Sequence, residues 1–117
     1  MKSLIALAFA LSMMVPVAAH AGWGVIAVDD QVGDKDPAYG VGGGDSKAEA
    51  SQSAMKFCKE ASGKKCDVAV TYEKCGAYAS SKKYSGTGTA STAQEAKKKA
   101  LNECNNASCK VLIADCN

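Results

Sequence analysis

Two stretches of this sequence repeat each other: Gly40-Val-Gly-Gly-Gly-Asp-Ser-Lys-Ala-Glu-Ala-Ser-Gln-Ser-Ala-Met-Lys-Phe-Cys58 and Gly86-Thr-Gly-Thr-Ala-Ser-Thr-Ala-Gln-Glu-Ala-Lys-Lys-Lys-Ala-Leu-Asn-Glu-Cys104. Each residue of the second stretch lies 46 positions after its counterpart in the first, without a gap. Both contain two glycines spaced by two, a hydroxyl residue with Glu three positions later, several alanines and a closing cysteine. Such a constant spacing indicates a duplicated structural unit.

Each stretch contains a signal for the start of a helix. Ser46-x-x-Glu49 and Thr92-x-x-Glu95 are capping boxes, in which the hydroxyl accepts a bond from the N3 amide and the glutamate reaches back to the N-cap amide. We therefore predict helices from Ser46 to Glu60 or Ala61 and from Thr92 to Cys104.

The glycines and alanines of each stretch predict close packing of its helix. The predicted buried helix faces comprise Ala50, Ala54, Phe57, Cys58 and Ala61 in the first copy and Ala96, Ala100, Leu101 and Cys104 in the second. Gly40 and Gly42, like Gly86 and Gly88, share one face of an extended strand. We expect this glycine face of the strand, which has no side chains, to pack against the alanine face of the helix. A phosphate-binding loop is the alternative, but the final glycine of the dinucleotide motif and the P-loop Lys-Ser/Thr are both absent.

The remaining segments complete two β-β-α-β units. Cys75-Gly-Ala-Tyr-Ala-Ser80 matches Trp23-Gly-Val-Ile-Ala-Val28 at a spacing of 52. The expected strands cover 23–29, 38–43, 66–72, 75–80, 84–89 and 109–115. The predicted fold class is α+β: one domain over 22–117, with repeats at 22–74 and 75–117 related by a pseudo-two-fold axis. Each helix packs on an antiparallel or mixed sheet, and disulfides staple the domain.

Residues 1–21 have the pattern of a signal peptide. Met1-Lys2 is a short basic start, an apolar run follows, and Ala19-His20-Ala21 is a small-x-small cleavage site. We expect cleavage after Ala21, a mature chain without a membrane anchor, and a periplasmic or secreted location. The alternative is an uncleaved signal anchor. The formal net charge of +2 is too small to indicate a nucleic-acid partner.

All six cysteines follow the predicted cleavage site, and their even number indicates three disulfides. The repeat favours one of the 15 possible pairings. Cys58–Cys66 and Cys104–Cys109 each bracket the short loop after a helix, which leaves Cys75–Cys116. A zinc site is poorly supported, because no CxxC pair occurs and the one histidine, His20, precedes the cleavage site. We expect no metal and no cofactor.

No catalytic constellation stands out, so we expect a binding protein rather than an enzyme, although the sequence leaves catalysis open. Paired cysteines without a histidine do not support a thiol nucleophile, and no motif marks a Ser/Lys pair. The acidic segment from Asp29 to Asp36 lacks the spacing of a calcium loop. The candidate binding surface consists of Lys97, Lys98, Lys99, Asp29, Asp30 and Asp36. The alternative for all six is an ordinary solvated surface.

The ordered motifs also resemble a known family. They comprise Trp23-Gly-Val-Ile-Ala, the Gly-x-Gly before a capped Ala-rich helix ending in Cys, Cys75-Gly-Ala-x-Ala and Glu95-Ala-x-x-x-Ala-Leu-x-x-Cys104. Together they are similar to the bacterial domain of unknown function 4189 (DUF4189) across residues 22–117. Its members are mostly small exported bacterial proteins without an agreed activity. The resemblance implies the fold and export, and it transfers no catalytic residues.

The leading functional hypothesis is a small exported binding protein of the bacterial envelope with a protein partner, such as an inhibitor, an immunity-type protein or a surface assembly factor. The alternative is an envelope glycan-binding or hydrolytic domain that uses the Asp29–Asp36 loop with Tyr39, Tyr78 and Tyr84. A third hypothesis places function in an oligomer interface. The copies differ most on their helix surfaces, where Ser51-Gln-Ser53 corresponds to Lys97-Lys-Lys99. Function near the helices is expected to lie in that difference.

Overall fold

The computed structural model describes residues 22–31 and 36–117 of the chain. The predicted signal peptide, residues 1–21, lies outside the described residues, as do residues 32–35 of the acidic segment.

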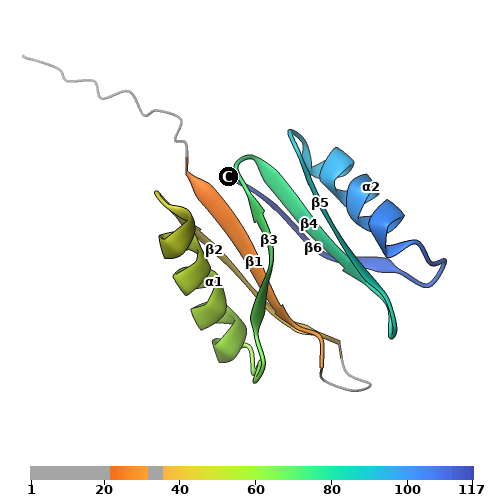
Figure 1. Cartoon of the computed structure of the whole chain (residues 1–117), viewed down its shortest axis with the longest axis horizontal. Coiled ribbons are helices and arrows are strands. Elements are labelled where there is room, and N and C mark those ends of the chain that lie inside the picture. The colour runs from red at the N-terminus through yellow and green to blue at the C-terminus, as the bar shows by residue number, and fades with distance from the viewer. Residues whose placement is uncertain (1–21, 32–35) are drawn as a thin grey trace, which may run out of the picture.

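The chain folds into two β-β-α-β units, as predicted (Figure 1). The first unit comprises β1 (Trp23–Asp29), β2 (Ala38–Gly44), α1 (Lys47–Glu60) and β3 (Asp67–Tyr72). The second comprises β4 (Cys75–Ser80), β5 (Ser85–Ala90), α2 (Ala93–Cys104) and β6 (Lys110–Cys116). Each unit forms its own three-stranded sheet, in the orders β2-β1-β3 and β5-β4-β6, and all described strand pairs are antiparallel.

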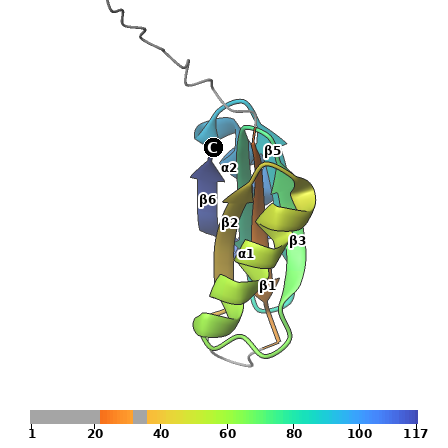
Figure 2. The same cartoon turned by 90° about the vertical axis from the view of Figure 1, so that its left-hand side faces the viewer.

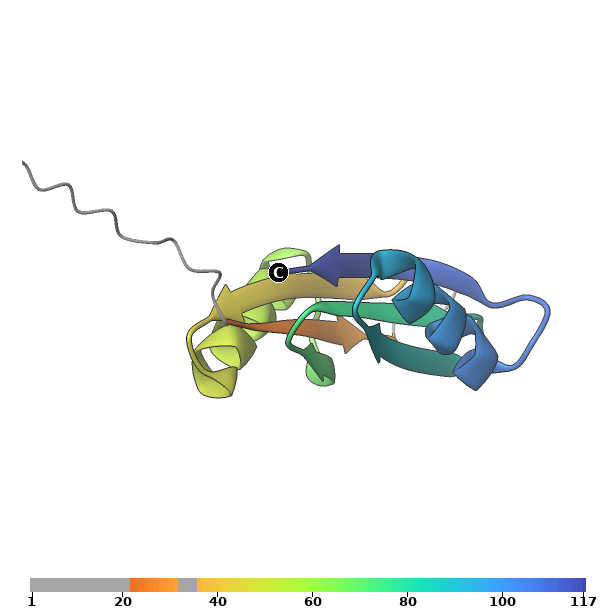
Figure 3. The ribbon, with the colours of Figure 1, turned by 90° about the horizontal axis from the view of Figure 1, so that it is seen from above.

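The two sheets face each other, and the two helices cover their outer faces. Figure 1 shows α1 and α2 on opposite sides of the strands, and Figure 3 shows the same arrangement from above. Figure 2, taken from the α1 side, shows that helix lying over its own sheet. The structure is therefore built in four layers, helix–sheet–sheet–helix, and sheet-on-sheet packing joins the repeats.

The predicted contact between glycine strands and alanine helices is confirmed in both repeats. A Cβ atom on Gly42 would lie 2.3 Å from Ala54 N, and one on Gly88 would lie 2.4 Å from Ala96 O. These obstacles belong to the helix backbone, so no side-chain rotation can relieve them. The residues that form the helix side of these contacts are spaced by four and are fully or almost fully buried: Ala50, Ala54, Cys58, Ala96, Ala100 and Cys104.

Three residues of the predicted helix faces were assigned wrongly. Phe57 is 48% exposed, Leu101 is 38% exposed and Ala61 lies in the exposed class. A helix that rests directly on a glycine strand makes contact along a single narrow row, so neighbouring positions are left outside it. Ser62, shortly after α1, has a left-handed backbone with φ of 79°. Gly63 follows it and is needed for space, because a Cβ there would lie 2.4 Å from Cys66 Sγ.

Three disulfides close the described structure: Cys58–Cys66, Cys104–Cys109 and Cys75–Cys116. They join the same cysteines as the pairing expected from the repeat. Cys75 and Cys116 are register partners on β4 and β6.

The side chain of Tyr72 fills the space between the two sheets. Buried Ile26, Val28, Val70 and Tyr78 surround it in the apolar cluster between the sheets. A Cβ on Gly24 or Gly76 would lie 2.3 Å from an atom of the Tyr72 ring. The two glycines occupy equivalent positions on β1 and β4, so one aromatic ring uses the space that both repeats leave open.

Tyr72 pairs with Asp115, the residue at the equivalent position of the second repeat. Tyr72 is the register partner of Gly24, and Asp115 is the register partner of Gly76. The Tyr72 hydroxyl donates to Asp115 Oδ2 at 2.6 Å. Burial, followed by this hydrogen bond, raises the pKa of Tyr72 above its usual value. The two repeats are thus joined by an asymmetric pair at equivalent positions.

Gly42→Ala should lower the free energy of unfolding by about 1–3 kcal/mol, because the new methyl group would overlap helix backbone. Gly43→Ala is the matched control, since its Cβ would have Trp23 O as nearest neighbour at 3.7 Å. We expect that change to stay within about 0.5 kcal/mol. Urea unfolding measures both, and equal stabilities of the two variants would contradict the packing described here.

Tyr72→Phe should lower the free energy of unfolding by about 1.5–3 kcal/mol, the usual contribution of a hydrogen bond to a charged group. The wild-type protein should also lose stability as the pH rises above about 10, because Tyr72 ionises there only in the unfolded chain. The variant should lose less over the same range. Tyr84→Phe changes an exposed tyrosine and should keep the wild-type profile. Parallel pH profiles for Tyr72→Phe and wild type would count against this role of Tyr72.

Candidate functional site

Asp29, a member of the predicted acidic site, has a structural role. Its side chain is 3% exposed and accepts three backbone bonds, from Gln31 N at 2.9 Å, Lys64 N at 2.8 Å and Lys65 N at 2.9 Å. The Lys65 amide, followed by those of Gln31 and Lys64, holds the pKa of Asp29 below its usual value. The carboxylate therefore fixes the loop between α1 and β3 to the end of β1.

Asp29→Asn should reduce stability at neutral pH. The three backbone amides share two carboxylate oxygens in the wild-type protein, whereas an asparagine side chain has one acceptor oxygen. A carboxylate with a lowered pKa stabilises the fold above its unfolded pKa, and this contribution is lost as the pH falls below about 4. The variant should therefore show a shallower acid loss than wild type in thermal unfolding between pH 2 and 7. Asp67→Asn, at an exposed acid on β3, is the control and should keep the wild-type slope.

The other residues of the predicted loop site converge only in part. Asp36 and Tyr39 line a surface cavity with Asp29, Lys64 and Lys65. Tyr78 is buried between the sheets and donates to Asp30 Oδ2 at 3.3 Å, while Tyr84 lies 51% exposed between β4 and β5. Burial, with Asp30 as the nearest charge, raises the pKa of Tyr78. The three tyrosines therefore do not form one glycan platform.

The glutamates of the capping boxes have structural roles that differ in part from prediction. The Ser46 and Thr92 hydroxyls accept bonds from the amides of Glu49 and Glu95, each at 3.2 Å, as expected. The predicted return bonds to the N-cap amides were wrong. Glu49 Oε1 accepts from Asp45 N at 3.0 Å, one residue earlier, and Glu95 Oε1 accepts from the Thr92 hydroxyl at 3.4 Å.

Lys97, Lys98 and Lys99 lie exposed on α2, and Lys99 has a specific partner. Its ammonium group donates to Thr89 O at 3.1 Å. Thr89 belongs to β5, an edge strand, so this bond occupies a carbonyl that would otherwise face an added strand.

A second side chain of α2 protects the same edge. Glu103 Oε1 accepts from Thr87 N at 2.7 Å and from the Thr87 hydroxyl at 3.3 Å. Lys99 and Glu103 thus cover one acceptor and one donor of β5. Natural sheets commonly block exposed edges with charged side chains, because unpaired backbone groups invite strand addition.

Two other edges are protected in a different way. The pairing of β3 with β1 is irregular at Ile26/Ala27, and that of β6 with β4 is irregular at the equivalent Tyr78/Ala79. Such bulges twist an edge strand and make further pairing difficult.

Within residues 22–31 and 36–117, nothing gives the edge formed by β2 either kind of protection. Its seven residues pair with β1 in unbroken register, from Trp23↔Gly44 to Asp29↔Ala38. The counterparts of Lys99 and Glu103 on α1 are Ser53 and Phe57, which carry no charge. Among the described side chains, none makes a hydrogen bond to Val41 N or Gly43 O, the counterparts of the two covered groups. The aromatic side chains of Tyr39 and Phe57 are 37% and 48% exposed.

The open β2 edge is therefore the candidate functional site. The sequence differences that indicate it were recognised at one position and missed at the other. The difference between Ser53 and Lys99 lies within the helix-surface contrast already identified. The difference between Phe57 and Glu103 was missed because Phe57 was assigned to the buried face.

No group of three or more His, Cys, Asp or Glu residues in the described part of the chain is placed to hold a metal ion. Neither helix within 22–31 and 36–117 has the length and apolar character needed to cross a membrane. All six cysteines are in disulfides.

Comparison with known proteins places this architecture in a family. The structure is similar to the NMR structure of Rv1813c from Mycobacterium tuberculosis, with a TM-score of 0.65 and 22% sequence identity over 98% of this chain and 96% of that chain. At this identity the likeness concerns the fold alone. No curated protein matches the chain. The sequence model of the domain of unknown function DUF4189 matches residues 23–116, and the chain therefore belongs to the DUF4189 family.

Proposed function

We propose that this protein is an exported, non-enzymatic binding module that adds an extended segment of a partner protein to the open edge of β2. Three disulfides support an oxidising location outside the cytoplasm. The predicted signal peptide, with cleavage after Ala21, supports the finer assignment to the periplasm or the exterior of the cell.

The observation that carries the proposal is the difference between two equivalent edges. The duplicated unit produces β2 and β5 with the same neighbours, and a Cβ on Gly40 or Gly86 would meet the main chain of Phe57 or Glu103 at 2.7 Å and 2.9 Å. The two helix residues therefore stand at the same place beside their strands. In one repeat this place holds a carboxylate that covers the edge, and in the other it holds an exposed aromatic ring.

The backbone groups exposed along the β2 edge determine which kind of partner can bind there. A row of outward backbone N–H and C=O groups is matched by another extended backbone, which is the mode of recognition called β-augmentation. Main-chain bonds at Val41 and Gly43 would supply the register of the added strand. Phe57 and Tyr39 would contact apolar side chains of that strand, because exposed aromatic rings are efficient anchors at interfaces. The partner is thus an extended, partly apolar polypeptide.

The double variant Ser53→Lys/Phe57→Glu tests the proposal by giving β2 the protection of β5. The probe is a displayed library of linear peptides selected on the oxidised wild-type domain. Selected peptides should bind the double variant at least tenfold more weakly, as measured by titration calorimetry. The matched control is Gln52→Lys/Lys56→Glu, with the same spacing on the exposed face of α1, and it should keep wild-type affinity.

The rate at which backbone amides exchange with solvent shows where the peptide binds. In the free domain, the Val41 amide should exchange with solvent faster than the Thr87 amide, whose bond to Glu103 covers it. Bound peptide should slow exchange at Val41. Equal binding to both variants, or no protection at Val41, would refute the site. Concentration-dependent dimers that disappear in the double variant, without peptide binding, would show that a second copy of the chain is the occupant.

A further inference from the structure

The disulfide Cys75–Cys116 differs from the other two in its relation to the repeat. Cys58–Cys66 and Cys104–Cys109 occur at equivalent places and close the helix-to-strand loop of each unit. The counterparts of Cys75 and Cys116 in the first unit are Trp23 and Glu73. The first unit therefore forms the equivalent pair of strands, β1 and β3, without a disulfide at this place.

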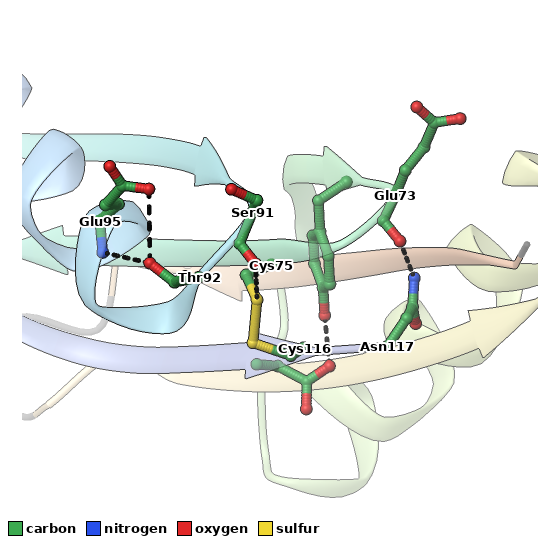
Figure 4. The surroundings of a disulfide bond; sticks show 9 residues. Glu73, Cys75, Ser91, Thr92, Glu95, Cys116 and Asn117 are labelled. Atoms are coloured by element: carbon green, nitrogen blue, oxygen red, sulfur yellow. Dashed lines mark hydrogen bonds between the residues drawn. A yellow bond between two sulfur atoms is a disulfide. The ribbon is translucent and has the colours of Figure 1, made fainter. Parts of the chain in front are cut away.

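The same disulfide is also the accessible one. Five of the six cysteines are buried, whereas Cys116 is exposed. Cys75 and Cys116 lie in the wall of a surface cavity of about 1030 Å³, at the end of the molecule where Gly22 and Asn117 meet. Figure 4 shows the bond between the start of α2 and the chain end at Asn117. A thiol from solvent therefore has access to the residue Cys116, while the four cysteines of the other two disulfides are buried.

Cys75 lies on the enclosed side of the bond. Cys75 is 4% exposed, and its Sγ lies 3.7 Å from Ser91 O, directly before the N-cap residue Thr92 of α2 (Figure 4). An incoming thiol therefore reaches Cys116 first, and Cys75 is the sulfur that leaves.

Hydrogen bonds hold the end of β6 in place in addition to the disulfide. Asn117 N donates to Lys74 O at 2.8 Å, and Asn117 Nδ2 donates to Glu73 O at 2.9 Å. The antiparallel ladder between β4 and β6 continues up to this point. We therefore expect β6 to stay in place when the disulfide is broken, so that the chemical change occurs at the surface of a folded domain.

We propose that Cys75–Cys116 is a thiol-exchange site for a small thiol or a partner dithiol. The incoming thiolate attacks Cys116 Sγ and forms a mixed disulfide, while the Cys75–Cys116 bond breaks and its electron pair leaves on Cys75, which is then protonated. A second thiolate attacks the donor sulfur of the mixed disulfide and releases Cys116. The donor thiols are oxidised to a disulfide, and the Cys75/Cys116 pair gains two electrons and two protons.

The test uses the oxidised mature protein with reduced glutathione as the probe. Samples are trapped with iodoacetamide over time, and each cysteine is followed by peptide mass spectrometry. Cys75 and Cys116 should become modified at least tenfold faster than the other four cysteines, and the glutathione adduct should be on Cys116. Simultaneous modification of all six cysteines, earlier opening of either buried pair, or an adduct mainly on Cys75 would overturn the proposal.

A variant separates exchange from unfolding. Cys75→Ser/Cys116→Ser should keep the wild-type circular dichroism spectrum and the slow modification of the four remaining cysteines. Faster modification of those four would show that Cys75–Cys116 has a structural rather than an exchange role. The labelling of the wild-type protein decides the proposal even if this variant fails to fold. This inference does not depend on the β2 edge.

Discussion

The direct contact between each helix and a strand without side chains is the constraint on which the rest of this structure depends. Gly40, Gly42, Gly86 and Gly88 allow helix backbone to approach at distances that even one methyl group would prevent. The helix must then present its smallest residues, which explains the rows of alanine. The buried cysteines Cys58 and Cys104 continue those rows. Such a core buries few large side chains, so the disulfides matter: each contributes about 2–4 kcal/mol to a domain stability of about 5–15 kcal/mol.

Duplication creates a second constraint where the two sheets meet. Gly24 and Gly76 leave equivalent space in the two sheets, but one aromatic ring fills both spaces. A second large ring at the equivalent position of β6 would compete for the same volume. The counterpart of Tyr72 is therefore Asp115, which is smaller and accepts the tyrosine hydroxyl. The repeats cannot be identical where they meet, and this asymmetry fixes which sheet supplies the ring.

The parts of the fold that were predictable from sequence are those that repeat along the chain. The helix starts, the glycine-on-alanine packing and the two units all depend on residues separated by a few positions or by a constant spacing. The contacts between repeats have no such periodic signature. Neither the ring position of Tyr72 nor the bonds from the Lys64 and Lys65 amides to Asp29 could be read from spacing, because they depend on long-range contacts. Phe57 was misassigned because its helical spacing suits burial, whereas close packing narrows the buried row to every fourth residue.

The proposed function depends on the positions at which the two copies differ. A duplicated unit begins with two identical edges, and the chemistry that blocks one edge would block the other equally well. Glu103 and Lys99 show that this fold can protect an edge with two side chains from its own helix. The absence of charge at Phe57 and Ser53 is therefore not imposed by the fold. An unprotected edge exposes any protein to unwanted pairing. We propose that the open edge beside the exposed ring of Phe57 is where the partner segment binds.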